Sequence, residues 1–162
     1  MMKKTLLRVL VLAGAMGAAC MAQSNSAYIF VASGGATGSA RTEATLQAGA
    51  GFEAALPKGF GAGAEIGALS PYNSWGDATL GAFSATGYYH FRHGRQERLD
   101  PFVGAGYTRF FHSGGANLFH YAGGVNVWAA RHVGVRFEFR DQVDTQYSTV
   151  HYWGVRFGVA LR

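Results

Sequence analysis

Six charged residues recur at spacings that could bring them together for ion pairing or for acid–base chemistry. Arg136, Glu138 and Arg140 alternate with apolar residues, so in an extended strand their side chains share one face. The set, three acidic and three basic, consists of Glu53, Glu65, Arg136, Glu138, Arg140 and Arg156. No cleft-like loop adjoins these residues, so we interpret them as a network of buried ion pairs.

A second candidate chemistry is nucleophilic catalysis. His112 with Ser113, and His120, are the available base and nucleophile types. They do not match the His-x-Ser-Asn spacing of the barrel enzymes that deacylate lipid A. A histidine beside a serine in a loop is usually only solvated, so we predict no catalytic, metal-binding or cofactor-binding residues. The glycine-rich segment 34–38 lacks the Gly-Lys-Ser/Thr of a phosphate loop.

The amino-acid composition limits the classes of protein fold that could position the six charged residues. The chain has 162 residues, of which 49% are hydrophobic and only 14% charged, against about 25% charged in an ordinary soluble domain. The chain has 24 glycines but only 3 prolines, which excludes a collagen-like repeat. Its hydrophobic content is too high for a disordered chain. The length suits one domain.

The first 22 residues have the pattern of a secretory signal peptide. Lys3, Lys4 and Arg8 precede an apolar run from Val9 to Ala19, whose 11 residues fall short of the roughly 20 that a spanning helix needs. Cleavage after Ala22 would leave a domain from 23 to 162 without cysteine, with 11 basic and 9 acidic residues and a net charge of +2. That charge gives no reason to expect nucleic acid as a partner. Lipidation of Cys20 is a competing reading, but the residues before it lack the large aliphatic side chain that lipoprotein processing prefers.

No second apolar run is long enough for a membrane helix, which leaves a closed barrel as the way to span a membrane. Stretches of alternating apolar and polar residues, separated by turn residues, predict eight strands. The predicted strands are 26–33, 43–56, 59–69, 77–91, 101–112, 117–129, 133–141 and 149–161. The fold class is therefore all-β, an eight-stranded antiparallel up-and-down transmembrane β-barrel.

Alternation also predicts which side chains point inward. In 133–140 the apolar residues would face lipid, and the charged set would lie with glycines on the inner face. An eight-stranded barrel is only just wide enough to be filled by side chains, so a polar plug is favoured over an ion gate. The facing of 26–33, 77–91 and 117–129 is ambiguous.

Aromatic residues near the strand ends predict two girdles at the membrane interfaces. One girdle would comprise Tyr72, Trp75, Phe110, Phe111, Phe119 and Tyr147. The other would comprise Tyr88, Tyr89, Phe91, Phe102 and Trp128. Arg109 falls on a lipid-facing row, so we place it near the rim, where it snorkels to the polar layer or contacts a lipid phosphate.

The turns 57–59, 92–100 and 130–132 would share the periplasmic end with both termini, because the strand number is even. The loops 34–42, 70–76, 113–116 and 142–148 would lie at the opposite end. These loops are short and offer little surface for adhesion or ligand binding.

Three segments carry a resemblance to a known family: 101–107 (PFVGAGY), 121–128 (YAGGVNVW) and 133–141 (VGVRFEFRD). Together with the alternating last strand, they resemble the outer-membrane β-barrels related to the OmpA transmembrane domain and OmpX. The resemblance implies insertion by the barrel-assembly machinery, a salt-bridged lumen, and a surrounding of outer-membrane lipid and lipopolysaccharide. Family members typically end on an aromatic residue, whereas this sequence ends at Arg162. We expect no peptidoglycan-binding domain after the barrel and therefore no wall-anchoring role.

The sequence thus predicts a monomeric integral protein of the outer membrane, structural or a minor porin-like protein, without catalysis. Two alternatives stay open. One is a barrel enzyme acting on lipid A. The other is a soluble periplasmic lipocalin-like barrel that binds a ligand, in which the apolar row would face inward.

Overall fold

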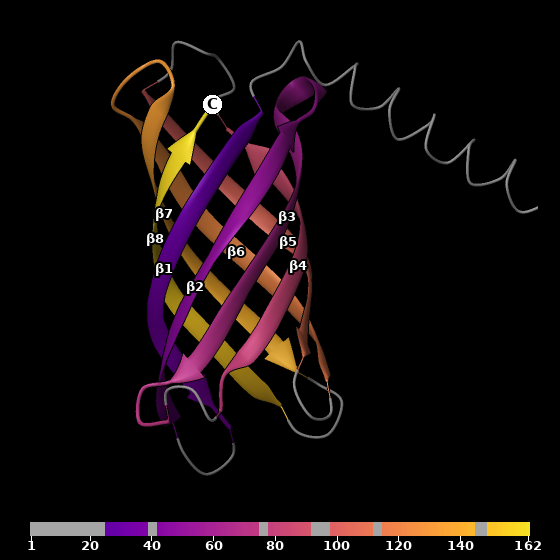
Figure 1. Ribbon diagram of the computed structural model, residues 1–162. Helices are drawn as coiled ribbons and strands as arrows, with labels where there is room; N and C mark the ends of the chain where they lie inside the picture. Colours follow the sequence, from indigo (N-terminus) through magenta and orange to yellow (C-terminus); the bar gives the residue numbers. More distant parts are fainter. Residues whose placement is uncertain (1–24, 39–41, 75–77, 92–97, 112–114, 145–148) are drawn as a thin grey trace, which may run out of the picture.

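A computed structural model describes residues 25–38, 42–74, 78–91, 98–111, 115–144 and 149–162. Eight strands form a closed barrel in which each strand pairs antiparallel with the next and β8 closes on β1 (Figure 1). The strands are β1 (Ser26–Thr37), β2 (Thr42–Ala55), β3 (Phe60–Pro71), β4 (Leu80–His90), β5 (Leu99–Phe111), β6 (Ala116–Trp128), β7 (Val133–Asp144) and β8 (Val150–Leu161). The predicted fold class is confirmed. No helix in the described part of the chain is long and apolar enough to cross a membrane.

The predicted boundaries lie within three residues of the observed ones, except at the end of β1. This strand continues to Thr37, through a glycine pair that we had placed in a loop. The pair is strand because β8 comes very close here: a Cβ at Gly34 would lie 1.8 Å from the backbone oxygen of Trp153. Glycine thus marks a close approach between two backbones rather than a turn.

Burial alternates along the strands, which fixes the inner and outer faces. In β4, Ser84, Thr86 and Tyr88 are buried, whereas Phe83 and Tyr89 are exposed. The three strands whose facing was ambiguous carry apolar or aromatic residues on both faces, so their alternation is weak in the sequence. The inner row of β1 includes Tyr28 and Phe30, and that of β6 includes His120, Asn126 and Trp128.

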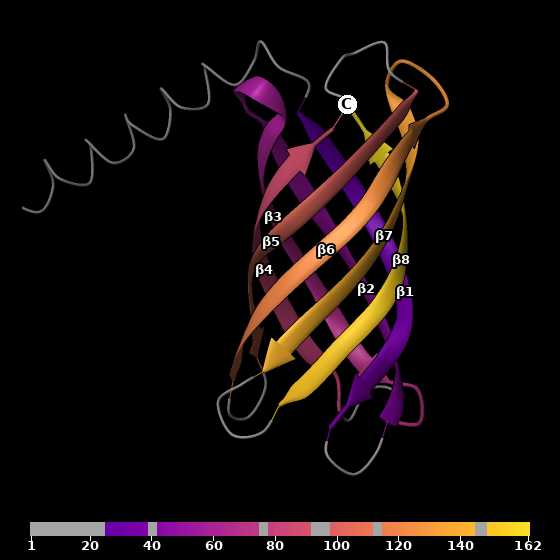
Figure 2. The same cartoon turned by 180° about the vertical axis from the view of Figure 1, so that it is seen from behind.

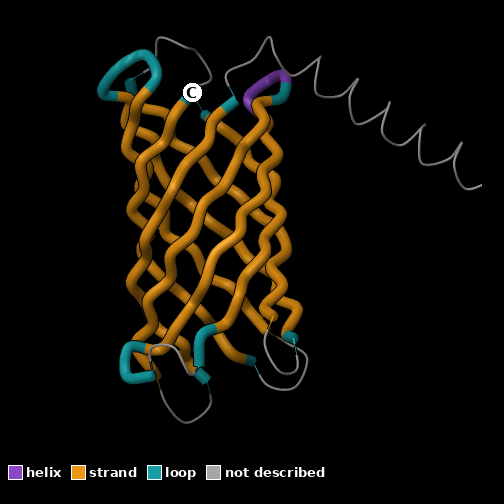
Figure 3. The backbone as a smooth tube through the Cα atoms, in the orientation of Figure 1, coloured by secondary structure: helices purple, strands orange, loops and turns teal. Residues whose placement is uncertain are grey.

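Both ends of the described chain lie at one end of the barrel, together with the short 3-10 turn η2 (Pro57–Gly59) (Figures 1 and 3). This turn needs positive φ at two successive residues, Lys58 (64°) and Gly59 (84°). Glycine adopts such values without strain. The β6–β7 connection lies at the same end, as predicted. The predicted signal peptide, 1–22, lies outside the described residues.

The outer surface is apolar over most of its height, while the interior is largely polar. Ile29, Ile66 and Phe119 are 64%, 65% and 70% exposed, respectively. In contrast, sixteen polar or charged residues in the described part of the chain are buried, among them all six members of the predicted charge set. A soluble globular domain normally buries apolar residues and keeps charges outside, so this distribution is inverted.

The prediction of two aromatic girdles is partly wrong. Tyr72, Phe111 and Phe119 are exposed near one end, and Tyr89 and Phe91 near the other. Four residues that we had assigned to the girdles instead point into the barrel, namely Tyr88, Phe102, Phe110 and Trp128. Two of these belong to pairs of consecutive aromatic residues, and successive side chains of a strand point to opposite faces. Trp75 and Tyr147 lie outside the described residues.

Candidate functional site

The six predicted charged residues meet inside the barrel. Each is between 2% and 5% exposed. They come from strands on opposite walls: Glu53 from β2 and Glu65 from β3, with the other four from β7 and β8. The predicted lumen charge network is therefore present as one connected cluster.

Glu65 is the acceptor that joins the two walls. Arg140 donates to both of its oxygens, at 2.6 Å and 3.0 Å, in the parallel arrangement that favours arginine–carboxylate pairs. Arg156 contacts the same carboxylate at 3.1 Å. The hydroxyl of Tyr28 donates to Glu65 Oε1 at 2.6 Å. Three side chains from three strands thus converge on one carboxylate.

Glu138 lies among all three arginines. Its Oε1 accepts from Arg140 Nε at 2.7 Å and from Arg156 Nη1 at 2.8 Å. Its Oε2 accepts from Arg136 Nε at 3.1 Å. Because each charge faces several partners of opposite sign, the cluster satisfies the condition under which buried ions are tolerated.

Aromatic rings cover the arginines on the sides that carboxylates leave open. The guanidinium carbon of Arg136 lies 3.9 Å from the ring centre of Phe102, 4.6 Å from that of Tyr28 and 5.0 Å from that of Tyr88. That of Arg156 lies 3.7 Å from the ring centre of Phe30. All four distances fall within the range of cation–π attraction. These four inward aromatic residues are therefore part of the polar core.

The network extends toward the end that carries the termini through two residues that the sequence analysis missed. His90 Nε2 lies 2.5 Å from Glu53 Oε1, and its Nδ1 lies 2.9 Å from the carboxylate of Asp100. Asn126 also donates to Asp100, at 3.1 Å. Asp100 had been assigned to a turn, and His90 belongs to a strand of ambiguous facing. In the sequence, only the spacing of His90 from Tyr88 and Thr86 could have indicated an inward position.

Glycines make room for these long side chains, as the sequence predicted. At Gly51, on β2, a Cβ would lie 2.6 Å from the Tyr28 ring and 2.8 Å from Glu65 Cγ. These separations are shorter than packed carbon atoms allow, so glycine is needed to seat the Tyr28–Glu65 pair. The inner glycines thus serve the packing of the charge network.

His120, the candidate base for an enzyme, is not at the rim of the barrel. It is completely buried in the lumen, where its ring nitrogens contact Thr86 Oγ1 at 2.9 Å and Thr108 Oγ1 at 2.8 Å. His112 and Ser113 lie outside the described residues. Among the residues that the structure describes, no group of three or more His, Cys, Asp or Glu side chains is placed to hold a metal ion.

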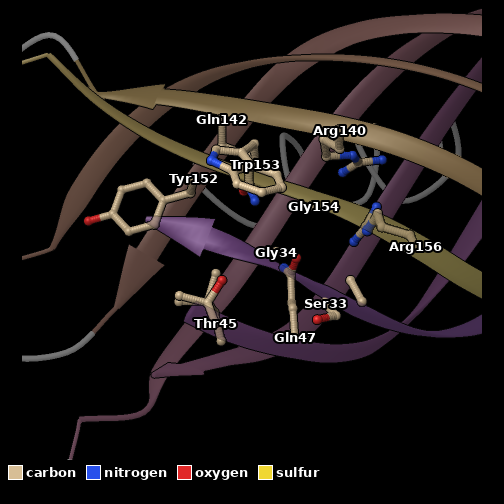
Figure 4. Close-up of a pocket in the computed structure, with 12 residues that line it drawn as sticks. Ser33, Gly34, Thr45, Gln47, Arg140, Gln142, Tyr152, Trp153, Gly154 and Arg156 are labelled. Atoms are coloured by element: carbon tan, nitrogen blue, oxygen red, sulfur yellow. The ribbon is translucent and has the colours of Figure 1, made fainter. Parts of the chain in front are cut away.

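A small vestibule adjoins the network on the side nearer the end opposite the termini (Figure 4). Arg140 and Arg156 point into it, and its other polar lining residues include Gln47, Gln142 and Tyr152. Its cavity volume is about 10 Å³, enough for roughly one water molecule. The geometry is therefore suited to tying opposite walls together, and this vestibule is too small for an organic substrate.

Comparison with known proteins supports the fold. No family model and no curated protein sequence matches the chain. Among solved structures, Neisserial surface protein A is similar, with a TM-score of 0.69 and 13% identity over 85% of this chain and 96% of that one. The N-terminal β-barrel domain of Pseudomonas aeruginosa OprF has a TM-score of 0.61 and 16% identity, over 86% of this chain and 98% of that one. The outer membrane protein OprG from the same organism has a TM-score of 0.57 and 10% identity, over 86% of this chain and 95% of that one. The chain thus has the fold of eight-stranded outer-membrane barrels, as the sequence resemblance implied.

Proposed function

We propose that this protein is an integral β-barrel of the bacterial outer membrane. The observation that carries the proposal is the inverted distribution of its side chains, with an apolar wall outside and a charge network inside. In a closed barrel every backbone group is paired between strands, which makes the structure compatible with the hydrocarbon core. Outer-membrane lipid and lipopolysaccharide would surround the wall, and the barrel-assembly machinery would insert it after a signal peptide is removed.

The role that fits the interior best is structural. Charged side chains from four strands fill the lumen, and aromatic rings pack against their guanidinium groups. Such a plug gives the barrel a rigid cross-section and no continuous pore, so we favour a structural protein over a porin. We also infer that the protein is not an enzyme, since His120, the candidate base, is engaged with two threonines inside the lumen. The expectation of a monomer is retained from the sequence.

The soluble lipocalin-like alternative requires the apolar row to line a ligand cavity. The apolar residues of β7 and β8 instead lie on the outer surface, with Phe137 44% and Val155 59% exposed. The inner rows of the same strands carry Arg136, Arg140 and Arg156. On these two strands the apolar rows therefore line no ligand cavity, and they would leave a large apolar surface in water.

Membrane integration is tested by washing isolated outer membranes with alkaline carbonate and running the retained protein on a detergent gel with and without boiling. We expect the protein to stay in the membrane pellet and the unboiled form to migrate differently, because a closed barrel resists the detergent until it is heated. Circular dichroism in detergent should be dominated by strand. Release by carbonate, with identical mobility before and after boiling, would contradict the proposal.

A further inference from the structure

The apolar wall carries one polar patch that the proposed function does not use. Along the strands that the structure describes, the outward rows contain charged or histidine side chains only at Arg109, Asp141 and His151. All three lie near the end opposite the termini, on β5, β7 and β8, which run side by side with β6 across the face seen in Figure 2. We call this the outer patch, and its members are Arg109, Asn117, Phe119, Tyr121, Asp141 and His151.

Asp141 is an acid on an outward row, yet it is only 6% exposed. Its Oδ2 accepts from the Tyr121 hydroxyl at 2.6 Å and from His151 Nδ1 at 2.8 Å. Its Oδ1 is buried without a partner. Acidic side chains facing the lipid are costly and tend to mark functional positions. The Asp141 carboxylate holds the His151 ring in a fixed place on the outer wall.

His151 remains accessible in that position, with 40% of its side chain exposed. Arg109 is also exposed, and its Nη1 donates to Asn117 Oδ1 at 3.1 Å. Each of the two basic side chains is therefore anchored by a neighbour through one nitrogen. An arginine guanidinium has five N–H donors in a planar fork that matches phosphate.

The distance between the two basic side chains determines which kind of ligand could contact both of them. Arg109 is on β5 and His151 on β8, three strand spacings away, or about 14 Å around the wall. Phe119, on β6 between them, is a large apolar residue that is 70% exposed. The patch thus offers two anion-binding groups with an apolar surface between them, near one membrane interface.

We propose that the outer patch binds a bis-phosphorylated disaccharide lipid, the chemistry of the lipid A part of lipopolysaccharide. One phosphate would pair with Arg109. The other would accept a hydrogen bond from Nε2–H of His151 in its imidazolium form, whose Nδ1–H is held by Asp141, while acyl chains pack on Phe119. A phosphatidylethanolamine headgroup has a single phosphate and is too short to span three strands. This inference rests on the proposed function, because the patch meets lipid only if the wall is in a membrane.

The test uses the mature chain folded in detergent and native mass spectrometry to count retained lipid. The probes are bis-phosphorylated lipid A, mono-phosphorylated lipid A and phosphatidylethanolamine. Wild type should retain one molecule of the bis-phosphorylated lipid. Arg109→Gln and His151→Gln should each weaken retention about tenfold, as expected for loss of a charged hydrogen bond. Mono-phosphorylated lipid A should bind more weakly to wild type and lose its dependence on one of the two residues.

The matched control is Arg131→Gln, in an exposed turn at the other end of the barrel, which should leave retention unchanged. All variants should keep the heat-dependent gel shift, because the replaced side chains are exposed. Equal retention of phosphatidylethanolamine, or lipid A binding that is the same in wild type and both patch variants, would overturn the proposal while the shift persists. Loss of the shift in wild type would instead refute the proposed function.

Discussion

Replacement of Arg140 by methionine is expected to lower the free energy of unfolding of the barrel by about 3 to 5 kcal/mol, the cost of breaking a buried ion pair from one side. Arg140 is 2% exposed and contacts both Glu65 and Glu138. Without it, these two carboxylates share the two remaining arginines and the core gains a net negative charge. Urea titration of the protein folded into phospholipid vesicles measures the change.

The control for this prediction is Arg131→Met, which removes the same side chain from an exposed turn. We expect it to change the unfolding free energy by less than about 0.5 kcal/mol. Planar bilayers supply a second measurement. The wild-type barrel should show no stepwise conductance, and the Arg140→Met barrel should leak. Wild-type stability in Arg140→Met would mean that the network does not hold the walls together.

Replacement of Ile66 by arginine is expected to cost about 2 to 4 kcal/mol in vesicles, the penalty for a basic side chain on the lipid face near the bilayer midplane. Ile66 is in the middle of β3 and 65% exposed. On a soluble protein, the same substitution at an exposed site would be close to neutral. The sign and size of the effect therefore report the surroundings of the wall.

Leu99→Arg is the matched comparison for Ile66→Arg. Leu99 is similarly exposed, at 52%, but it begins β5, at the end of the barrel that carries the termini. A basic side chain near the interface costs only about 0 to 1 kcal/mol. Equal unfolding free energies for the two variants would argue against a depth-dependent lipid environment.

The sequence was most informative where one face of a strand is charged. In β7, Arg136, Glu138 and Arg140 alternate with apolar residues, so both the strand and its facing followed directly. The inner faces of β2, β3 and β8 could be assigned in the same way, and together these strands supplied all six network residues. Alternation is a local property, and it was sufficient for these elements.

Contacts between strands could not be predicted in this way. The role of His90 depends on Glu53 and Asp100, which come from two other strands, and on the register that brings them together. The C-terminal end of β1 and the inward position of Tyr88 likewise depend on neighbouring strands. Asp141 was assigned to no site, because its partners Tyr121 and His151 are aligned with it only by the pairing of β6, β7 and β8.

The central claim, that the apolar wall faces lipid, is tested most directly by spin labels. The chain from Gln23 onward contains no cysteine, so Ile66→Cys can be labelled alone, with Lys58→Cys in the exposed turn as the control. In vesicles, the label at 66 should collide with oxygen and be protected from a water-soluble nickel chelate, and the label at 58 should show the reverse. Ready access of the chelate to the label at 66 would contradict the account.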